Sequence, residues 1–196
     1  AKNFFPSVEY YSAEANRCYF FTATPKHSLT ISKPGMNDGY VYGKVIVNIP
    51  APKLVKEGYI LPPKMIVKTI DVREEQINES EHIVDTIDQI SVKKVLICAR
   101  STKQIIKLID QTNFTQELES RDYSCMYITA KTGAYIDGKK VNRDIFFDTL
   151  NTWGKDPDKR FVVLHHSILS EGINVKGLEA ALFLRNMDVI GLSQTI

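Results

Sequence analysis

Apolar residues follow two different spacings in the C-terminal two-thirds of the chain. Four short runs are almost continuously apolar, which is typical of strands buried on both faces: residues 93–100, 123–130, 160–169 and 177–185. Three segments between them have helical spacing: residues 73–90, 102–120 and 142–156. Asn142 is a candidate N-cap of the last of these helices. Strands that alternate with amphipathic helices predict an α/β fold, a parallel sheet with helices on both faces.

The first third of the chain has a less regular pattern. Residues 17–24, "RCYFFTAT", and residues 40–50, "YVYGKVIVNIP", are aromatic or β-branched runs that predict strands, the first of them buried. A short helix is predicted to follow and to end at Gly58. Residues 49–70 are predicted to connect two packed units, and residues 131–141, "KTGAYIDGKKV", to form a loop.

The composition is that of an ordinary globular protein, with 196 residues, of which 43% are hydrophobic and 24% charged. The formal net charge of +2 permits a nucleic-acid partner without requiring one, because local patches decide such binding. Three widely separated cysteines, Cys18, Cys98 and Cys125, predict buried free thiols in a reducing compartment. No apolar run approaches a membrane span. The sequence therefore predicts a cytoplasmic protein with no membrane partner, and leaves nucleoid, nuclear and viral settings open.

Several chemistries are missing from the sequence. Residues 39–45, "GYVYGKV", are the nearest approach to a phosphate loop, but their spacing is one residue short and Val45 replaces the magnesium-binding hydroxyl. His165 and His166 are neighbours on a predicted strand, so their side chains point to opposite sides and cannot chelate a metal together. One of the two is predicted to be packed and the other to lie near the following loop. The sequence therefore predicts no metal site.

Polar residues follow several of the predicted strands. In α/β folds, ligands bind at the loops beyond the carboxyl ends of parallel strands. Hydroxyl groups, backbone N–H groups and cations are the groups that hold phosphate oxygens. The candidate residues are Thr22 and Thr24 in "FFTATP", Arg100, Ser101 and Thr102 in "ICARST", Thr129, Lys131 and Thr132 in "ITAKTG", and Ser170, Gly172 and Asn174 in "SILSEGINVKGL".

The order of these segments resembles that of the superfamily 2 helicases and translocases, which have two RecA-like domains. "FFTATP" looks like their motif III, and "KVLICARST" looks like motif IV. "YITAKTG" occupies the place of a motif that contacts nucleic acid. "ILSEGINVKGLEAALFLR" looks like motif V of the branch with the DEAH-type, restriction-motor and repair helicases, and "GLSQTI" like the opening of motif VI. The resemblance covers essentially the whole chain, and the order and spacing of the motifs make it specific.

The resemblance implies a fragment that runs from motif III to the start of motif VI. Residues 1–48 would be the C-terminal part of a first RecA-like domain, residues 49–70 the interdomain connection, and residues 71–196 a truncated second RecA-like domain. The parent protein would be an ATP-dependent helicase that uses ATP and Mg²⁺ and binds nucleic acid, with DNA favoured over RNA. Its phosphate loop and metal-binding carboxylates would lie upstream of residue 1 and its arginine finger beyond Ile196. The fragment alone would therefore bind no cofactor and hydrolyse no ATP.

The resemblance also implies roles for single residues. Those that would approach the nucleotide are Gly172, Asn174 and Gln194, and those that would couple the nucleotide to domain movement are Thr22, Thr24 and Gln194. Those that would contact the nucleic-acid backbone are Arg100, Ser101, Thr102, Thr129, Lys131, Thr132 and Ser170. Two positions depart from the pattern, because many relatives have Asp at Asn174 and Pro at Lys176. An asparagine can still accept a hydrogen bond from a ribose hydroxyl, which weakens the assignment without removing it.

Two other classes of protein are alternatives to a helicase fragment. The first is a non-catalytic RecA-like module that binds nucleic acid or a protein partner, and the second is an unrelated doubly wound enzyme. An unrelated doubly wound enzyme would need a glycine-rich first turn, and the sequence contains none.

Overall fold

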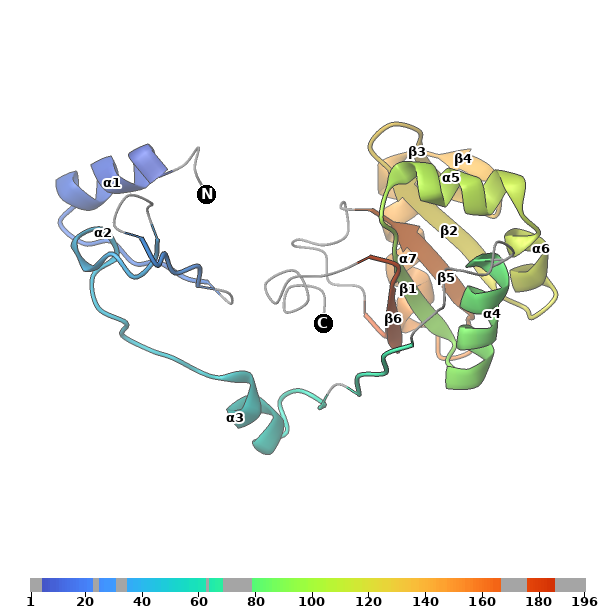
Figure 1. Cartoon of the computed structure of the whole chain (residues 1–196), viewed down its shortest axis with the longest axis horizontal. Coiled ribbons are helices and arrows are strands. Elements are labelled where there is room, and N and C mark those ends of the chain that lie inside the picture. Colours follow the sequence, from blue (N-terminus) through green and yellow to red (C-terminus); the bar gives the residue numbers. More distant parts are fainter. Residues whose placement is uncertain are drawn as a thin grey trace. The chain divides into compact units, whose positions relative to one another are not determined.

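The computed structural model describes residues 5–22, 25–30, 35–62, 64–68, 79–166 and 176–185. The chain forms two compact units, Ala1–Val67 and Lys68–Ile196 (Figure 1). The boundary between the two units falls inside the segment 49–70 that the sequence assigns to a connection. The assignment of the flanking residues to two helicase domains stays a prediction.

The described part of the first unit contains three helices, α1 (Phe5–Glu14), α2 (Gly39–Tyr42) and α3 (Ala51–Lys56). The Asp38 carboxylate caps α2 by accepting a hydrogen bond from the backbone N–H of Tyr40 at 3.0 Å. Helix α3 begins directly after Pro50 and is the short helix that the sequence predicts.

The two strands predicted in the first unit are wrong for the residues that the structure describes. Residues 17–22 and 43–50 are extended chain without strand pairing, and residues 39–42 are helical. Their apolar side chains are open to solvent, with Phe21 94% exposed and Val45 83% exposed. A β-prone segment becomes a strand only when a neighbouring strand takes up its hydrogen bonds and another layer covers its side chains. The described residues of this unit supply neither.

The second unit is a mixed α/β unit built on a six-stranded sheet (Figure 1), which confirms the predicted α/β class. The strand order is β4-β3-β2-β5-β1-β6. Strands β2, β5, β1 and β6 are parallel to one another, and β3 and β4 are antiparallel additions at one side. The strands are β1 (Lys94–Cys98), β2 (Ser124–Thr129), β3 (Gly133–Ile136), β4 (Lys139–Val141), β5 (Phe161–His165) and β6 (Ala180–Phe183). The helices are α4 (Glu79–Ile90), α5 (Thr102–Gln111), α6 (Phe114–Glu119) and α7 (Arg143–Lys155).

Two details of this unit differ from the prediction. The segment 131–141 is a pair of strands, β3 and β4, rather than a loop. Asp137 and Gly138 both have positive φ, 45° and 74°, so Asp-Gly forms the tight turn that joins two twisted strands. The helical segment 102–120 is also interrupted, because the Thr112 hydroxyl bonds to the carbonyl of Leu108 and to the N–H of Phe114 and so competes with helical bonding.

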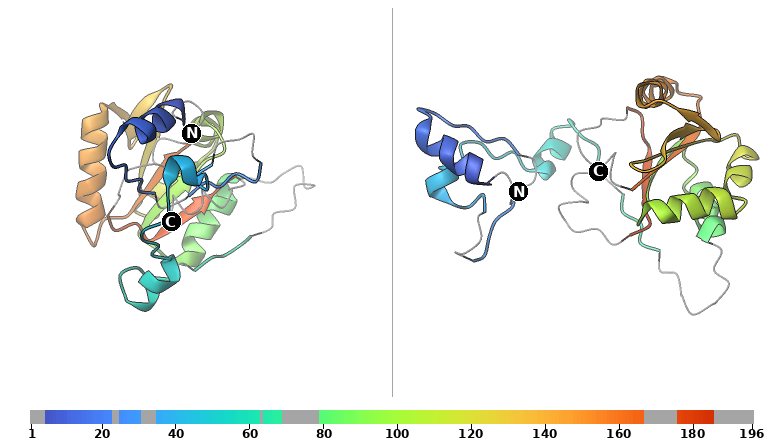
Figure 2. Two further views of the ribbon diagram at one scale, coloured as in Figure 1. Left: turned by 90° about the vertical axis from the view of Figure 1, so that its left-hand side faces the viewer. Right: turned by 90° about the horizontal axis from the view of Figure 1, so that it is seen from above.

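Helices cover both faces of the sheet, as the sequence predicts. Helices α4, α5 and α6 pack on one face, and α7 packs on the other (Figure 2, right). Alternate residues of each central strand enter the two cores, so that Val95 and Ile97 of β1 face the three helices while Leu96 and Cys98 face α7. Asn142 caps α7 by accepting a hydrogen bond from the N–H of Ile145 at 2.7 Å, as predicted.

A close backbone contact fixes the C-terminal end of α7. A Cβ atom on Gly154 would lie 2.3 Å from the carbonyl oxygen of Lys176, so only glycine fits there. The carbonyl of Gly154 accepts a 2.8 Å hydrogen bond from the ammonium of Lys94, which is only 4% exposed. A cation at a helix C-terminus is favourable because the last carbonyls carry partial negative charge. Lys94 and Gly154 therefore join the start of β1 to the end of α7.

We predict that Gly154→Ala destabilises the chain. Alanine would normally favour a helix over glycine by about 1 kcal/mol, but here the new methyl group must displace the backbone at Lys176. The expected loss in free energy of unfolding is about 2 kcal/mol, measured by urea denaturation. Asn151→Ala on the same helix is the control and should change that free energy by less than about 0.5 kcal/mol. An increase in stability for Gly154→Ala would contradict this packing.

Candidate functional site at the carboxyl edge of the sheet

The carboxyl ends of the parallel strands meet at one edge of the sheet. Cys98 of β1 is in register with His165 of β5 and with Phe183 of β6, and Ile128 of β2 is also in register with His165. The pairing continues one residue further, since the N–H of Ala99 donates to the carbonyl of His165 at 2.8 Å. The polar residues at this edge are Thr129, which ends β2, and Arg100, His166 and Arg185, which lie one or two residues beyond the ends of β1, β5 and β6.

The strand order creates a topological switch point between β1 and β5. The chain leaves β1 for β2, two places away in one direction, and leaves β5 for β6, two places away in the other. Helices α5 and α6 of the first connection pack on one face of the sheet, and the second connection includes residues outside the described ranges. In open α/β sheets, ligands bind beyond the carboxyl ends of the strands where the strand order reverses in this way.

A neutral pair, Cys98 and His165, lies beneath this edge. The Cys98 Sγ and His165 Nε2 atoms are 3.1 Å apart, and both side chains are fully buried. Burial raises the pKa of the Cys98 thiol to about 11, against a smaller opposite effect of Arg185. Burial, followed by the positive charges of Arg185 and His166, lowers the pKa of His165 to about 4. The pair is therefore a thiol and a neutral imidazole, without the thiolate that a cysteine nucleophile needs.

This pair bears out part of what the sequence predicts for its histidines and cysteines. His165 is packed and His166 is half-buried at the strand end, as expected. All three cysteines are free, and Cys98 and Cys125 are buried. The prediction is wrong for Cys18, which is exposed in the first unit.

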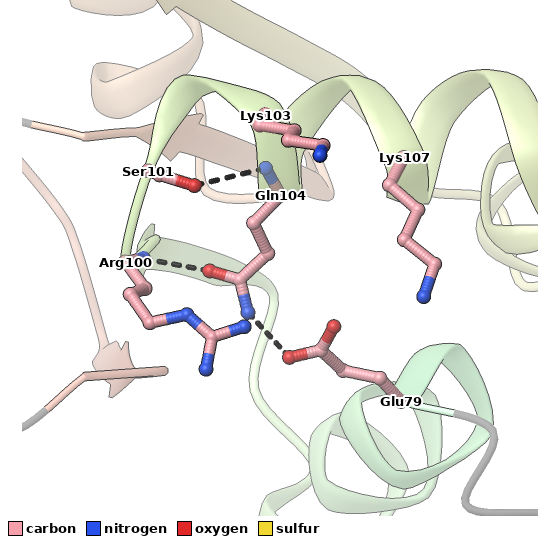
Figure 3. Close-up of a pocket in the computed structure, with 6 residues that line it drawn as sticks. All are labelled: Glu79, Arg100, Ser101, Lys103, Gln104 and Lys107. Atoms are coloured by element: carbon pink, nitrogen blue, oxygen red, sulfur yellow. Dashed lines mark hydrogen bonds between the residues drawn. The ribbon is translucent and has the colours of Figure 1, made fainter.

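A shallow pocket of about 250 Å³ lies at the carboxyl end of β1, where the chain turns into α5 (Figure 3). Ser101 caps α5, because its hydroxyl accepts a hydrogen bond from the N–H of Gln104 at 3.2 Å. The side-chain oxygen of Gln104 in turn accepts a 2.6 Å hydrogen bond from the N–H of Arg100. These two bonds fix the turn that carries the predicted residues Arg100, Ser101 and Thr102. The pocket is lined by Glu79, Arg100, Ser101, Lys103, Gln104 and Lys107.

Three cations of this pocket, Arg100, Lys103 and Lys107, are exposed. Within the described residues, none of them has a carboxylate oxygen within 4.0 Å. The sequence predicts Arg100 as a site residue, and the two lysines are not among the predicted residues. The segment "ARSTKQIIK" nevertheless indicates them, because residues 103 and 107 are about one helical turn apart and lie on the same face of a helix that starts at a strand end.

Four cations at the opposite, amino edge of the sheet are engaged with other groups. Lysine ammonium groups there meet a carboxylate, a carbonyl and an indole ring, and a guanidinium lies over a phenol ring. The contacts are Lys93 Nζ to Asp158 Oδ1 (3.3 Å), Lys94 Nζ to Gly154 O (2.8 Å), Lys159 Nζ to the Trp153 ring centre (4.2 Å) and Arg160 Cζ to the Tyr123 ring centre (4.3 Å). These four cations are therefore committed to the fold, whereas Arg100, Lys103 and Lys107 share one pocket at the carboxyl edge.

The predicted residues of "ITAKTG" form the turn between β2 and β3. The hydroxyl oxygens of Thr129 and Thr132 are 2.7 Å apart, and the Thr129 hydroxyl also accepts from the N–H of Thr132 at 2.9 Å. Thr129 is only 3% exposed, so its hydroxyl holds the turn together. Lys131, in contrast, is exposed. Contact of these three residues with phosphate stays a prediction.

The remaining predicted residues are not brought to this edge in the part of the chain that the structure describes. Thr22 is exposed and belongs to the first unit. Thr24, Ser170, Gly172, Asn174 and Gln194 lie outside the described residues. Their roles in nucleotide or nucleic-acid binding stay predictions.

No three side chains of His, Cys, Asp or Glu among the described residues are grouped so that they could hold a metal ion. No helix in the described ranges has the length and apolar character needed to span a membrane.

No family model matches the chain, and comparisons with curated proteins and with solved structures find no match either.

We predict that His165 makes stability fall as the pH is lowered from 7 to 5. Its pKa is about 4 in the folded chain against an ordinary 6.5, so the unfolded chain takes up the proton first between these values. The contribution is fully present above pH 6.5 and is lost progressively below it, by about 2 kcal/mol at pH 5. The measurement is urea denaturation at both pH values. His165→Gln should show a smaller loss than the wild type, whereas the exposed control His82→Gln should match the wild type. Equal losses in all three chains would contradict the assignment.

Proposed function

We propose that the second unit is a RecA-like domain that holds the phosphate backbone of nucleic acid at the carboxyl edge of its sheet. The observation that carries this proposal is the pocket at the carboxyl end of β1, which brings three exposed cations together. Arg100, Lys103 and Lys107 have no acidic partner among the described residues, while four cations at the amino edge are engaged with groups of the fold. Cations without partners that gather at a ligand-binding edge fit an anionic, extended ligand.

The architecture supports the same proposal. The sheet has four parallel strands with helices on both faces, which is compatible with a RecA-like domain. In the helicase interpretation, motif IV comprises β1 and the Arg100 turn, and the following motif comprises the Thr129–Gly133 turn after β2. Motif V would then follow β5. The polar residues of the first two motifs lie at the carboxyl edge, which is the arrangement that a nucleic-acid strand lying across this edge requires.

The proposed contacts are to the phosphate backbone and do not distinguish one base sequence from another. Arg100, Lys103, Lys107 and Lys131 offer positive charge, and Ser101 and Thr132 offer hydroxyl groups, all of which suit phosphate oxygens. A translocase needs contacts of this kind, because it must move along strands of any sequence. DNA is favoured over RNA only by the resemblance, since no described residue distinguishes a 2′-hydroxyl.

The ATP-dependent activity is proposed for a parent protein with two such domains. ATP and Mg²⁺ would bind between the domains, with Gly172, Asn174 and Gln194 near the nucleotide and Thr22 and Thr24 relaying its state. The described residues contain no phosphate loop and no cluster of metal-ligating side chains. We expect the 196-residue chain alone not to hydrolyse ATP.

We predict that Arg100→Gln and Lys103→Gln each weaken binding of a labelled single-stranded oligonucleotide to the chain. Each substitution should raise the dissociation constant about three- to tenfold at low salt, because one phosphate contact is lost. The slope of log K against log salt should become shallower by about 0.7 for each lost contact. Fluorescence anisotropy across a salt series measures both quantities.

The matched control is Lys155→Gln. Lys155 ends α7 beside the start of β1, at the amino edge, so the substitution removes the same charge from the other side of the sheet. It should leave the salt slope unchanged. If Lys155→Gln and Arg100→Gln weakened binding equally, net charge alone would explain the binding. That result would contradict a binding site at the carboxyl edge. No binding by the wild type at low salt would remove the nucleic-acid proposal and would leave a protein-binding module as the better interpretation.

A further inference from the structure

One acidic side chain, Glu79, lies among the cations of the pocket. It opens helix α4, and its carboxylate points towards Gln104, with Arg100 and Lys107 on either side of it in the view of Figure 3. A carboxylate is an unexpected group in a pocket that is proposed to hold phosphate, because like charges repel at this range.

A partly buried hydrogen bond holds this carboxylate in place. Glu79 Oε1 accepts a hydrogen bond from the side-chain Nε2 of Gln104, and Gln104 is only 5% exposed. A carboxylate can only accept here, so the amide nitrogen of Gln104 must face Glu79. The amide oxygen of Gln104 then faces the N–H of Arg100, at 2.6 Å. One side chain thus ties the start of α4 to the Arg100 turn.

Glu79 forms no close ion pair with a described residue. In the described part of the chain, no lysine or arginine nitrogen lies within 4.0 Å of its carboxylate oxygens. The carboxylate therefore offsets the three cations from a distance, and the cations keep their donors for another anion. A phosphate that enters the pocket gains three positive neighbours and one fixed negative neighbour.

We propose that Glu79 is a resident counter-ion of this pocket, which weakens its hold on the phosphodiester backbone of a single strand. The inference rests on the proposed function, because it assigns a residue that limits affinity at the same site. A limited affinity suits a domain that must release the strand as well as hold it.

The experiment compares Glu79→Gln with Glu81→Gln in the full 196-residue chain. Glutamine at position 79 can still accept the hydrogen bond from Gln104 and removes only the charge. Glu81 lies in the same first turn of α4 and does not line the pocket, so its substitution makes the same change in net charge and in the charge near the helix start. Fluorescence anisotropy with a labelled oligothymidylate measures the dissociation constant at several salt concentrations, and circular dichroism checks that both variants fold.

Glu79→Gln is expected to bind about three- to tenfold more tightly than the wild type at low salt, and the gain should shrink as salt screens the repulsion. Glu81→Gln is expected to change affinity less than twofold, an estimate of roughly the size that surface charges produce. Suppose that the wild type binds and Arg100→Gln binds more weakly, as the proposed function predicts. Equal affinities of Glu79→Gln and Glu81→Gln would then overturn the role of Glu79 and leave the proposed function intact. Failure of the wild type and of Glu79→Gln to bind at any salt concentration would overturn both.

Discussion

Parallel pairing of four buried strands is the constraint on which the rest of the second unit depends. Parallel strands cannot be joined by tight turns, so each connection crosses a face of the sheet and every strand ends at the same edge. Strands β2, β5, β1 and β6 obey this rule, and helices cover both faces of the sheet. The polar residues that follow the strands therefore gather at the carboxyl edge, although Arg100 and Arg185 are 85 positions apart in the sequence. The candidate site is a direct consequence of this topology.

The distribution of charge follows from the same architecture. The sheet interior excludes free charge, as the neutral Cys98–His165 pair beneath the edge illustrates. Lys94, the one buried lysine among the described residues, directs its ammonium at the last turn of α7. Cations at the amino edge likewise stabilise the fold through carboxylates, carbonyls and aromatic rings. The cations around the Arg100 turn form no ion pair within the described residues, so they are available to an external anion.

Much of this unit could be predicted from the sequence, because strands buried on both faces and amphipathic helices have distinct apolar spacings. The hairpin β3–β4 was missed although Asp137-Gly138 is a strong turn signal, since its strands are short and only partly apolar. Lys103 and Lys107 were missed because an exposed lysine on a helix has no signature until the fold places that helix at a strand end. Glu79 could not be found, since its position beside Arg100 depends on the packing of α4 against the start of α5. The strands predicted in the first unit were wrong because β-propensity does not reveal whether a partner strand is present.

The central claim is that an anionic strand binds the carboxyl edge rather than another part of the chain. The most direct test is a ¹H–¹⁵N NMR titration of the isotope-labelled chain with a single-stranded oligonucleotide. The account predicts that amide resonances of residues 100–103 and 129–133 shift progressively, while those of Lys159, Arg160 and Phe161 at the amino edge stay in place. Shifts confined to the amino edge or to the first unit, or no shift at saturating oligonucleotide and low salt, would contradict it.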